Sequence, residues 1–262
     1  MILNVGNSCY LGAALQCIAR TPGFLEHCKR DMTDEDGLRL VSFLDALRTG
    51  SGVLDPSALY DQLREYYPYF GEHQQHDCHE AIVVVLDYLD SKMGGAPSAV
   101  RTFFKLDRQT CIRCETCGHV RASEQEEYGL YESYFTEEID EILDGYHCDH
   151  CGTVDCQSSS KIVRHPPVMI VRLPKDLDVD KELDVIDIEG KSFKLFAMCK
   201  HIPMSDEGGH YIAMVRGEEC WNIYNDETCT TCESVDVNQA SVLLLLSTNF
   251  SYGDAVCPVM AC

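Results

Sequence analysis

Two Cys-x-x-Cys pairs in the middle of the chain constrain its fold more than any other sequence feature. The first pair is Cys114 and Cys117, the second is Cys148 and Cys151, and a glycine follows each pair. Turns of this kind point both sulfurs inward, so two of them can close a tetrahedral site around Zn²⁺. Such a site is structural, since four thiolates leave no open position for catalysis. The alternative is a set of free or oxidised cysteines on exposed turns. Nearby residues that could replace a ligand are Cys111, His119, His147, His150 and Cys156.

The cysteine content also indicates a cellular compartment. The 262 residues include 16 cysteines, and the first residues lack the basic and apolar stretches of a secretory signal. The most apolar run, residues 241–246, is far too short to span a bilayer. We therefore expect a soluble intracellular protein with no membrane partner. Its cysteines are then metal ligands, a nucleophile and core residues rather than disulfides.

Composition excludes one class of partner. The net charge of −22 argues against nucleic-acid binding, because that binding depends on Lys and Arg that neutralise phosphates. It suits a basic protein partner, or merely solubility. With 45% apolar residues the chain is typical of a globular protein of one large domain or two small ones.

The first residues combine a turn with the start of a helix. Asn4, Gly6, Asn7 and Ser8 favour a turn, and apolar residues at helical spacing follow. With Ser8 as N-cap, Cys9 falls in the first turn, where the helix dipole and unpaired N–H groups favour a thiolate. Asn4 could offer its side-chain amide to a developing oxyanion. A buried structural cysteine in a capped helix is the alternative reading.

Further elements follow from periodicity. Helices are expected over residues 10–20, 35–48 and 57–66, a buried strand over 168–173 and a further strand over 193–199. The run after residue 77 could be a strand, but Asp77 followed by Glu80 is a helix N-terminal signature. A plain surface helix is the alternative there. The acidic residues 178–187 are expected to form a solvated excursion between strands.

A second set of chemical groups lies near the end of the chain. Gly208 and Gly209 precede His210 at the mouth of a predicted strand, and a second strand ends in Asn225 and Asp226. A short loop between antiparallel strands would set His210 beside that end. A cysteine nucleophile needs such a base, and the base needs an orienting acceptor. Alone, His210 is more typical of an ordinary strand-end histidine.

These motifs resemble those of the ubiquitin-specific proteases. Their cysteine box runs Asn-x-Gly-Asn-Thr/Ser-Cys-Tyr, and residues 4–10 match it closely. Residues 75–81 resemble the Gln-Gln-Asp-Ala-x-Glu-Phe box with three departures, and Gly209-His210-Tyr211 with residues 221–226 resembles the histidine box. The resemblance makes Cys9 the nucleophile and Asn4 an oxyanion-hole residue. His210 becomes the general base.

The same resemblance leaves one question open and adds further residues. Asn225 stands at the usual triad aspartate, with Asp226 next to it, and either could orient His210; Asp226 could instead assist Asn4. In the family, the start of the helix after Asp77 lines the channel for the ubiquitin tail. Substrate-binding roles fall on Asp77, Gly209 and Tyr211. The resemblance selects four zinc ligands: Cys114, Cys117, Cys148 and Cys151.

The resemblance also implies a fold. It is the α+β, papain-like right hand, with a helical thumb, a β-rich palm and zinc-tipped β fingers, in one catalytic domain over residues 1–262. The thumb is expected over about 1–92. The fingers are expected over about 105–165, and the palm over about 93–104 and 166–262. The chain is short for the family and resembles a compact member, such as a viral one.

The implied reaction is hydrolysis of the isopeptide bond after the C-terminal Gly-Gly of ubiquitin. The implied partners of this monomer are ubiquitin and ubiquitinated proteins or polyubiquitin chains, in the cytoplasm, the nucleus or both. Two alternatives remain. One is a protease for another ubiquitin-like modifier, such as SUMO. The other is a zinc-stabilised ubiquitin-binding module without turnover, against which the intact Cys9, His210 and Asn225 argue.

Overall fold

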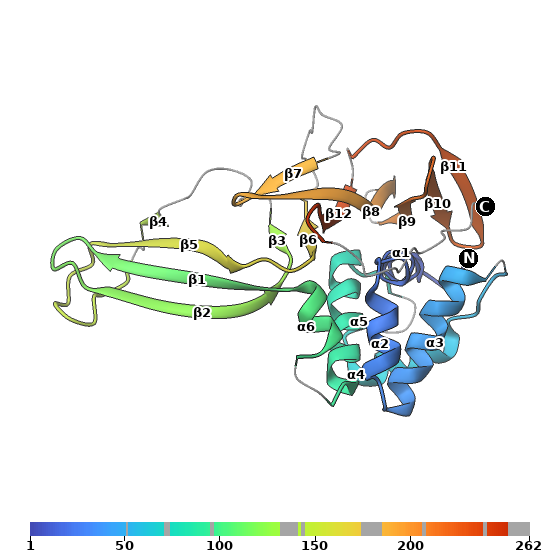
Figure 1. The fold of residues 1–262 in the computed structure, drawn as a ribbon, viewed down its shortest axis with the longest axis horizontal. Coiled ribbons are helices and arrows are strands. Elements are labelled where there is room, and N and C mark those ends of the chain that lie inside the picture. The colour runs from blue at the N-terminus through green and yellow to red at the C-terminus, as the bar shows by residue number, and fades with distance from the viewer. Residues whose placement is uncertain are drawn as a thin grey trace.

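The computed structural model describes residues 1–50, 52–70, 74–94, 97–131, 141–142, 145–173, 185–205, 208–237 and 240–250. Helices come first along the chain and strands follow (Figure 1). The helices, which we call the helical layer, are α1 (Cys9–Ala19), α2 (Phe24–Asp31), α3 (Glu35–Thr49), α4 (Ser57–Tyr66), α5 (Cys78–Lys92) and α6 (Ala99–Phe104). None of the described helices is long and apolar enough to cross a membrane.

The strands form two sheets. The finger sheet has the order β2-β1-β5-β4, and its strands are β1 (Lys105–Cys114), β2 (Val120–Tyr128), β4 (Glu141–Ile142) and β5 (Cys156–Arg164). The palm sheet has the order β11-β10-β9-β8-β12-β6-β3, with β7 paired to β8. Its strands are β3 (Leu130–Tyr131), β6 (Val168–Arg172), β7 (Val185–Ile188), β8 (Lys191–Ser205), β9 (Gly208–Arg216), β10 (Trp221–Asn225), β11 (Thr228–Cys232) and β12 (Ala240–Ser247).

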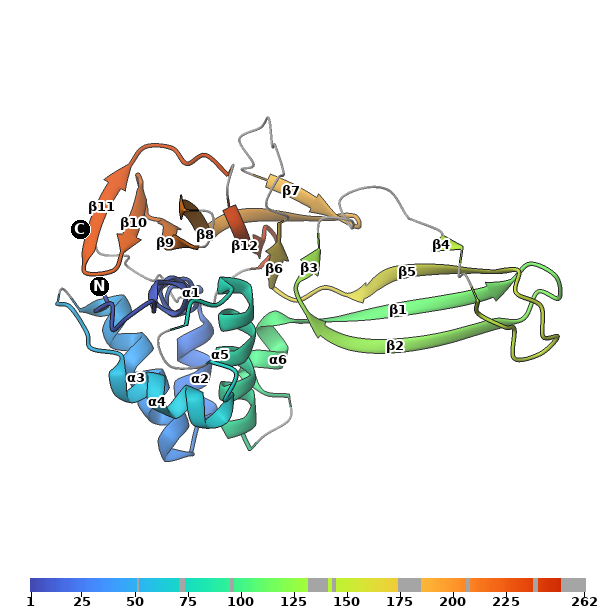
Figure 2. The ribbon, with the colours of Figure 1, turned by 180° about the vertical axis from the view of Figure 1, so that it is seen from behind.

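Helix α1 lies between the other helices and the palm sheet. All eleven of its residues are buried, and it contacts α5 and α3 on one side and β9 on the other. Figure 2 shows the same layering from behind, with the helices below the sheet. Because the helix is covered on every side, its residues are mostly small and apolar, without the polar stripe of a surface helix. Its N-terminus is thereby fixed against the palm sheet.

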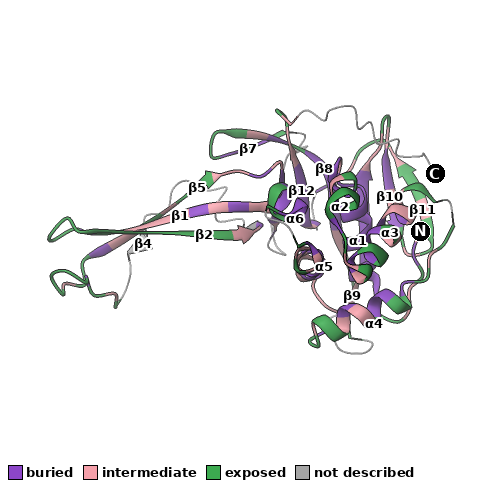
Figure 3. Ribbon diagram, turned by 60° about the horizontal axis from the view of Figure 1, so that its bottom comes forward, coloured by how far each residue is buried: buried purple, intermediate pink, exposed green. Residues whose placement is uncertain are grey.

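The palm sheet is buried on both faces. In β12, Val242 and Leu244 pack with the helical layer, whereas Leu243 and Leu245 pack into a second core on the opposite face. This second core includes Trp221 and residues of β7. Two covered faces explain why the central strands β6 and β12 are nearly continuous apolar runs rather than alternating patterns. Figure 3 shows buried residues, in purple, along much of the palm sheet.

The finger sheet extends away from both cores. Its strands β1 and β5 pair as far as Cys114 opposite Cys156, with one register shift between Asp107 and Arg108. Strand β2 is exposed over most of its length. The described apolar core at its far end comprises only Cys114, Cys148 and Cys156, with Ile112 and Tyr146 against it. So small a core needs another source of stability, such as a bound metal.

The structure confirms most elements expected from periodicity, including the helix after Asp77. The side chain of Asp77 caps α5 by accepting hydrogen bonds from His79 N and Glu80 N. Helices α2 and α6 were not predicted. Of the acidic stretch 178–187, residues 178–184 lie outside the described residues, and the expectation of a loop is wrong for Val185–Asp187, which belong to β7. The proposed limits of thumb, fingers and palm stay a prediction.

Candidate active site and metal centre

A tight turn presents Cys9 at the start of α1. Gly6 and Asn7 have φ values of 100° and 51°, in the left-handed region that glycine and asparagine adopt most readily. Ser8 occupies the N-cap position, but its predicted side-chain cap is not formed. Its hydroxyl instead accepts from Val5 N at 3.0 Å and donates to Asn4 Oδ1 at 3.2 Å. The serine therefore stabilises the turn, and the N–H groups of the first helical turn stay uncapped by it.

Asn4 is held at both ends of its carboxamide. Its Oδ1 accepts from Gly6 N at 3.1 Å and from Ser8 N at 3.3 Å, while its Nδ2 donates to Asp226 Oδ2 at 2.9 Å. Its backbone N–H donates to Glu227 Oε1 at 3.1 Å. The amide nitrogen carries two hydrogens. Within the described part of the chain, the bond to Asp226 uses one and leaves the other for an oxyanion.

His210 lies near the start of β9 and is oriented by Asn225. Its Nε2 donates to Asn225 Oδ1 at 2.7 Å, whereas Asp226 Oδ2 is 3.7 Å away, too far for a hydrogen bond. A proton on Nε2 leaves Nδ1 as the basic nitrogen of the neutral ring. The sequence left open whether Asn225 or Asp226 is the partner of His210. In the structure Asn225 contacts His210, and Asp226 contacts Asn4.

A residue without an assigned role connects the two halves of this site. Gln75, just before α5, places its Nε2 at 3.5 Å from Cys9 Sγ, and its carboxamide is hydrogen-bonded to the backbone of Gly209. Since Gly209 precedes His210, one side chain touches both the thiol and the histidine strand. Cys9 itself is 3% exposed. The sequence signal that could have indicated this role is the place of Gln75 at the start of residues 75–81, which resemble the Gln-Gln-Asp-Ala-x-Glu-Phe box.

Asp77 lies beside a surface pocket next to this junction. Besides capping α5, its Oδ2 accepts from Arg172 Nη2 at 3.3 Å. The pocket has a volume of about 800 Å³ and is lined by Tyr66, Tyr67, Asp77, His79, Glu80, Val83, Val84, Asp87 and Arg172. Three carboxylates against one guanidinium make the lining acidic. A basic, extended peptide suits such a lining.

The other two predicted substrate-binding residues lie on β9. Gly209 is needed as glycine, because a Cβ there would clash with His201 Nε2 and lie 2.8 Å from Ile202 O. The ring of Tyr211 packs against that of His201 with centroids 4.8 Å apart, and burial raises the pKa of its hydroxyl. Neither Gly209 nor Tyr211 lines the pocket that contains Asp77.

The predicted metal ligands lie together at the far end of the finger sheet, well away from Cys9 (Figure 1). The four sulfurs of Cys114, Cys117, Cys148 and Cys151 all lie within 4.8 Å of one another. Two of the sulfur separations are 3.6 Å and 3.7 Å. A tetrahedral zinc site with Zn–S bonds of about 2.3 Å has sulfurs about 3.8 Å apart, so this arrangement fits the ion.

Backbone geometry makes the two halves of this cluster alike. In each, a glycine of positive φ donates its N–H to the carbonyl of the first cysteine: Gly118 to Cys114 at 2.8 Å and Gly152 to Cys148 at 2.9 Å. The alternative ligands named from the sequence, including Cys111 and the histidines, are not part of the described cluster. The neighbouring thiol of Cys156 is buried beside it.

The cluster disfavours four protonated thiols. Desolvation alone would raise the pKa of Cys114, but hydrogen bonds from the backbone and thiol of Cys117 bring it down to about 6. The backbone N–H of His119 favours the Cys117 thiolate, but desolvation and hydrogen bonds with the other three thiols raise its pKa to about 12. A divalent cation bound to the four sulfurs would replace the protons of the thiols that are still protonated.

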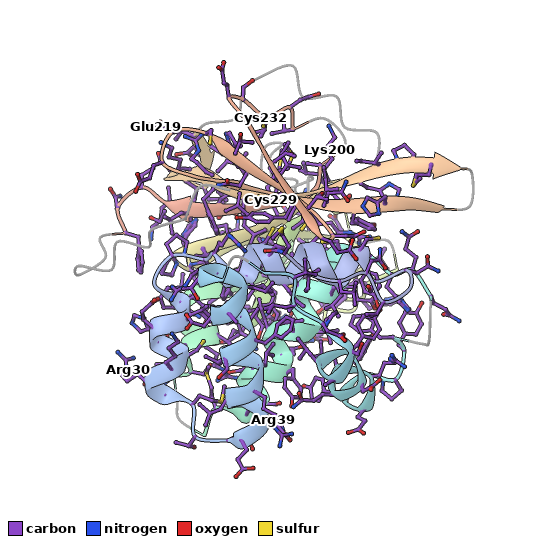
Figure 4. The ribbon with its side chains drawn as sticks, turned by 90° about the vertical axis from the view of Figure 1, so that its right-hand side faces the viewer. Arg30, Arg39, Lys200, Glu219, Cys229 and Cys232 are labelled. Carbon is purple, nitrogen blue, oxygen red and sulfur yellow. The ribbon has the colours of Figure 1, made fainter. Side chains whose placement is uncertain are left out.

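Two further cysteines do not join this cluster. Figure 4 shows Cys229 and Cys232 on the palm half with Lys200 and Glu219, opposite Arg30 and Arg39 on the helices. Both cysteines lie on β11, the edge strand of the palm sheet. Cys229 is disulfide-bonded, so the expectation that the cysteines form no disulfides is wrong for this residue.

Comparison with known proteins agrees with this architecture. Residues 2–246 match the family described as ubiquitin carboxyl-terminal hydrolase. Ubiquitin carboxyl-terminal hydrolase 4 of Arabidopsis thaliana is 21% identical, over 88% of this chain and 84% of that protein. Hydrolases 16 and 25 of the same plant are each 24% identical over 88% and 94% of this chain. The chain spans only 28% and 47% of those two proteins.

A solved structure shares the fold. It is a SAGA DUB module of Ubp8, Sgf11, Sus1 and Sgf73 bound to monoubiquitin, with a TM-score of 0.76 and 16% sequence identity. The superposition covers 95% of this chain and 69% of that one. Nearly the whole chain is therefore accounted for by one known fold.

Proposed function

The protein belongs to the ubiquitin carboxyl-terminal hydrolase family, and on that premise we propose that it is a thiol-dependent deubiquitinase. It hydrolyses the isopeptide bond after the C-terminal Gly-Gly of ubiquitin. The observation that carries the proposal is the junction of α1 and β9. There Gln75 contacts both the Cys9 sulfur and the backbone of Gly209, the residue before His210. Asn225 orients His210, and its neighbour Asp226 anchors the amide of Asn4.

The geometry supports a role for each residue in the reaction. The Cys9 thiolate attacks the carbonyl carbon of the terminal glycine, while His210 holds the thiol proton. The oxyanion accepts a hydrogen bond from Asn4 Nδ2, which the carboxylate of Asp226 holds in place. His210 then protonates the leaving lysine amine, and a thioester remains on Cys9. Water activated by His210 hydrolyses that thioester and releases ubiquitin.

Asn225 acts through the imidazole. By accepting from Nε2 it fixes the ring orientation and stabilises the imidazolium that forms when the thiol is deprotonated. An asparagine accepts this hydrogen bond as an aspartate would, although without its charge. The residue therefore suits the orienting role.

Charge supports a basic tail as the substrate. Asp77, Glu80 and Asp87 line the pocket beside the junction, and the chain as a whole carries a net charge of −22. The C-terminal tail of ubiquitin carries arginines, which such carboxylates attract. Gly209 and Tyr211 would contact the last residues of the tail. Position 209 has no room for a side chain, so the path of the tail is narrow there.

The finger-tip cluster is the proposed zinc site. Cys114, Cys117, Cys148 and Cys151 would hold Zn²⁺ as four thiolates, and the ion would stabilise the end of the finger sheet. Because all four positions would be filled, its role is structural. The sulfur spacing and the small size of the described core at that end support the assignment.

The wider setting is part of the proposal. Ubiquitin and ubiquitinated proteins or polyubiquitin chains are the partners, and residues 1–262 act as one catalytic domain and as a monomer. The cytoplasm, the nucleus or both are the proposed location.

A panel of reporters tests the substrate. The reduced, zinc-replete protein is incubated with matched fluorogenic conjugates of ubiquitin, of SUMO and of other ubiquitin-like modifiers that end in Gly-Gly. The proposal predicts that the ubiquitin conjugate has the highest kcat/KM. A preference for another modifier would move the assignment to that modifier. Tight ubiquitin binding without turnover of any conjugate would instead indicate a binding module.

A further inference from the structure

The carboxamide of Gln75 imitates a peptide group at the active site. Its Oε1 accepts from Gly209 N at 3.2 Å, and its Nε2 donates to the carbonyl of the same Gly209. Nε2 also lies 3.5 Å from Cys9 Sγ. A side-chain amide offers the same donor and acceptor as a backbone peptide unit. One side chain thus occupies both main-chain groups of Gly209 and contacts the thiol.

The pairing of β8 with β9 explains why the carbonyl of Gly209 is available to Gln75. Gly209 lies opposite Pro203, which has no N–H to contribute to the ladder. A Cβ at Gly209 would clash with His201 Nε2 and lie 2.8 Å from Ile202 O. The glycine is therefore packed closely against β8, while its N–H and carbonyl are paired with Gln75. An extended peptide that adds to the strand needs these same two groups.

The location makes this pairing relevant to substrate. Gly209 directly precedes His210, and the same carboxamide reaches Cys9, so a peptide that replaced it would have its backbone next to the thiol. Cys9 is only 3% exposed while Gln75 is in place. A nucleophile so covered has to be uncovered before a carbonyl carbon can reach it.

We propose that Gln75 is a latch, a positioning residue that occupies the substrate's backbone site at Gly209 and covers Cys9 until the Gly-Gly tail displaces it. The identity of the tail rests on the proposed function, whereas the covering of the Cys9 thiol does not depend on it. Substrate exchanges the two bonds of the latch for its own bonds to Gly209. The latch therefore weakens substrate binding, and it protects the thiol in the unliganded enzyme.

Two substitutions separate hydrogen bonding from bulk. Gln75→Ala removes the carboxamide, whereas Gln75→Met keeps its length and volume without its donor and acceptor. Gln74→Ala is the matched control, since Gln74 is the exposed neighbouring glutamine. Thermal unfolding of each variant confirms that it is folded. Both Gln75 variants are expected to behave alike, because the hydrogen bonds rather than the bulk hold the latch closed.

The first measurement is alkylation of Cys9 by iodoacetamide without substrate. The chain has 16 cysteines, so modification is followed on the Cys9 peptide by mass spectrometry. A net hydrogen bond changes an equilibrium constant by roughly fivefold. With two such bonds broken, both Gln75 variants should be alkylated about 5- to 25-fold faster than wild type and Gln74→Ala. Rates equal to wild type would overturn the latch.

The second measurement is the kinetics on a fluorogenic ubiquitin conjugate. The latch predicts that KM falls by about 5- to 25-fold in both Gln75 variants and that kcat/KM rises. A large fall in kcat at constant KM would overturn it, because the carboxamide would then serve the transition state. If wild type cleaves no ubiquitin conjugate, the proposed function fails. The alkylation result still decides the latch.

Discussion

Replacing Asn225 with alanine tests how His210 is oriented. The bond from His210 Nε2 to Asn225 Oδ1 is 2.7 Å long, and the ring is charged once it holds the thiol proton. A hydrogen bond to a charged group contributes about 1.5–3 kcal/mol, and about 1.36 kcal/mol corresponds to a factor of ten in rate. Asn225→Ala should therefore lower kcat/KM by about 10- to 150-fold. Initial rates on a fluorogenic ubiquitin conjugate, at concentrations below KM, measure this directly.

The matched substitution is Asp226→Asn. Asparagine keeps the shape and still offers an oxygen to Asn4 Nδ2, which now donates to Asp226 Oδ2 at 2.9 Å. Only the charge is lost, so a decrease of less than about tenfold is expected. Suppose instead that Asn225→Ala stays within about threefold of wild type while Asp226→Asn loses more than about 30-fold. Asp226 would then be the orienting residue, and the reasoning from the 2.7 Å and 3.7 Å distances would be refuted.

Three further outcomes are expected. Asn4→Ala should lower kcat by about 100- to 1,000-fold with little change in KM, measured on the same conjugate, because an oxyanion donor is lost. Cys151→Ser should lower the zinc content below about one ion per chain, measured by metal analysis, and lower the unfolding temperature, measured by calorimetry. The control Cys111→Ser should change neither quantity. Burial lowers the pKa of His79 below its usual 6.5, so the folded state favours the neutral ring. The stability that this group contributes is fully present above pH 6.5 and is lost as the pH falls through the lowered pKa. Between about pH 7.5 and pH 5, the unfolding free energy of His79→Asn should therefore fall less than that of wild type. Urea unfolding at both pH values measures this difference.

Sequence patterns predicted much of the fold because each pattern had one physical cause. The run at residues 168–173 is a strand buried on both faces, and Asp77 with Glu80 marks a real helix start. The predicted right-hand fold of the ubiquitin-specific proteases is confirmed by the structural neighbour and by the family match. Short α6 was missed because six residues carry too little periodicity to recognise.

The site was predicted only in part because its details depend on tertiary contacts. Residue types and order indicated Cys9 and His210, but nothing local separates Asn225 from its neighbour Asp226 as a partner for the imidazole. That choice depends on the turn after β10, where Asp226 has a φ of 49° and its carboxylate meets Asn4. Gln75 likewise acquires its contacts only when the segment before α5 meets β9. Ser8 was assigned a helix cap, but the carboxamide of Asn4 competes for its hydroxyl.

Hydrolysis of a fluorogenic ubiquitin conjugate by wild type and by Cys9→Ala tests whether Cys9 is the nucleophile of a deubiquitinase. Both are assayed under reducing conditions with zinc retained, at equal concentrations of folded protein. Wild type is expected to turn the conjugate over, and Cys9→Ala is expected to lose turnover while it still binds ubiquitin. Turnover that survives in Cys9→Ala, or wild-type protein that binds ubiquitin without cleaving the conjugate, would contradict this expectation.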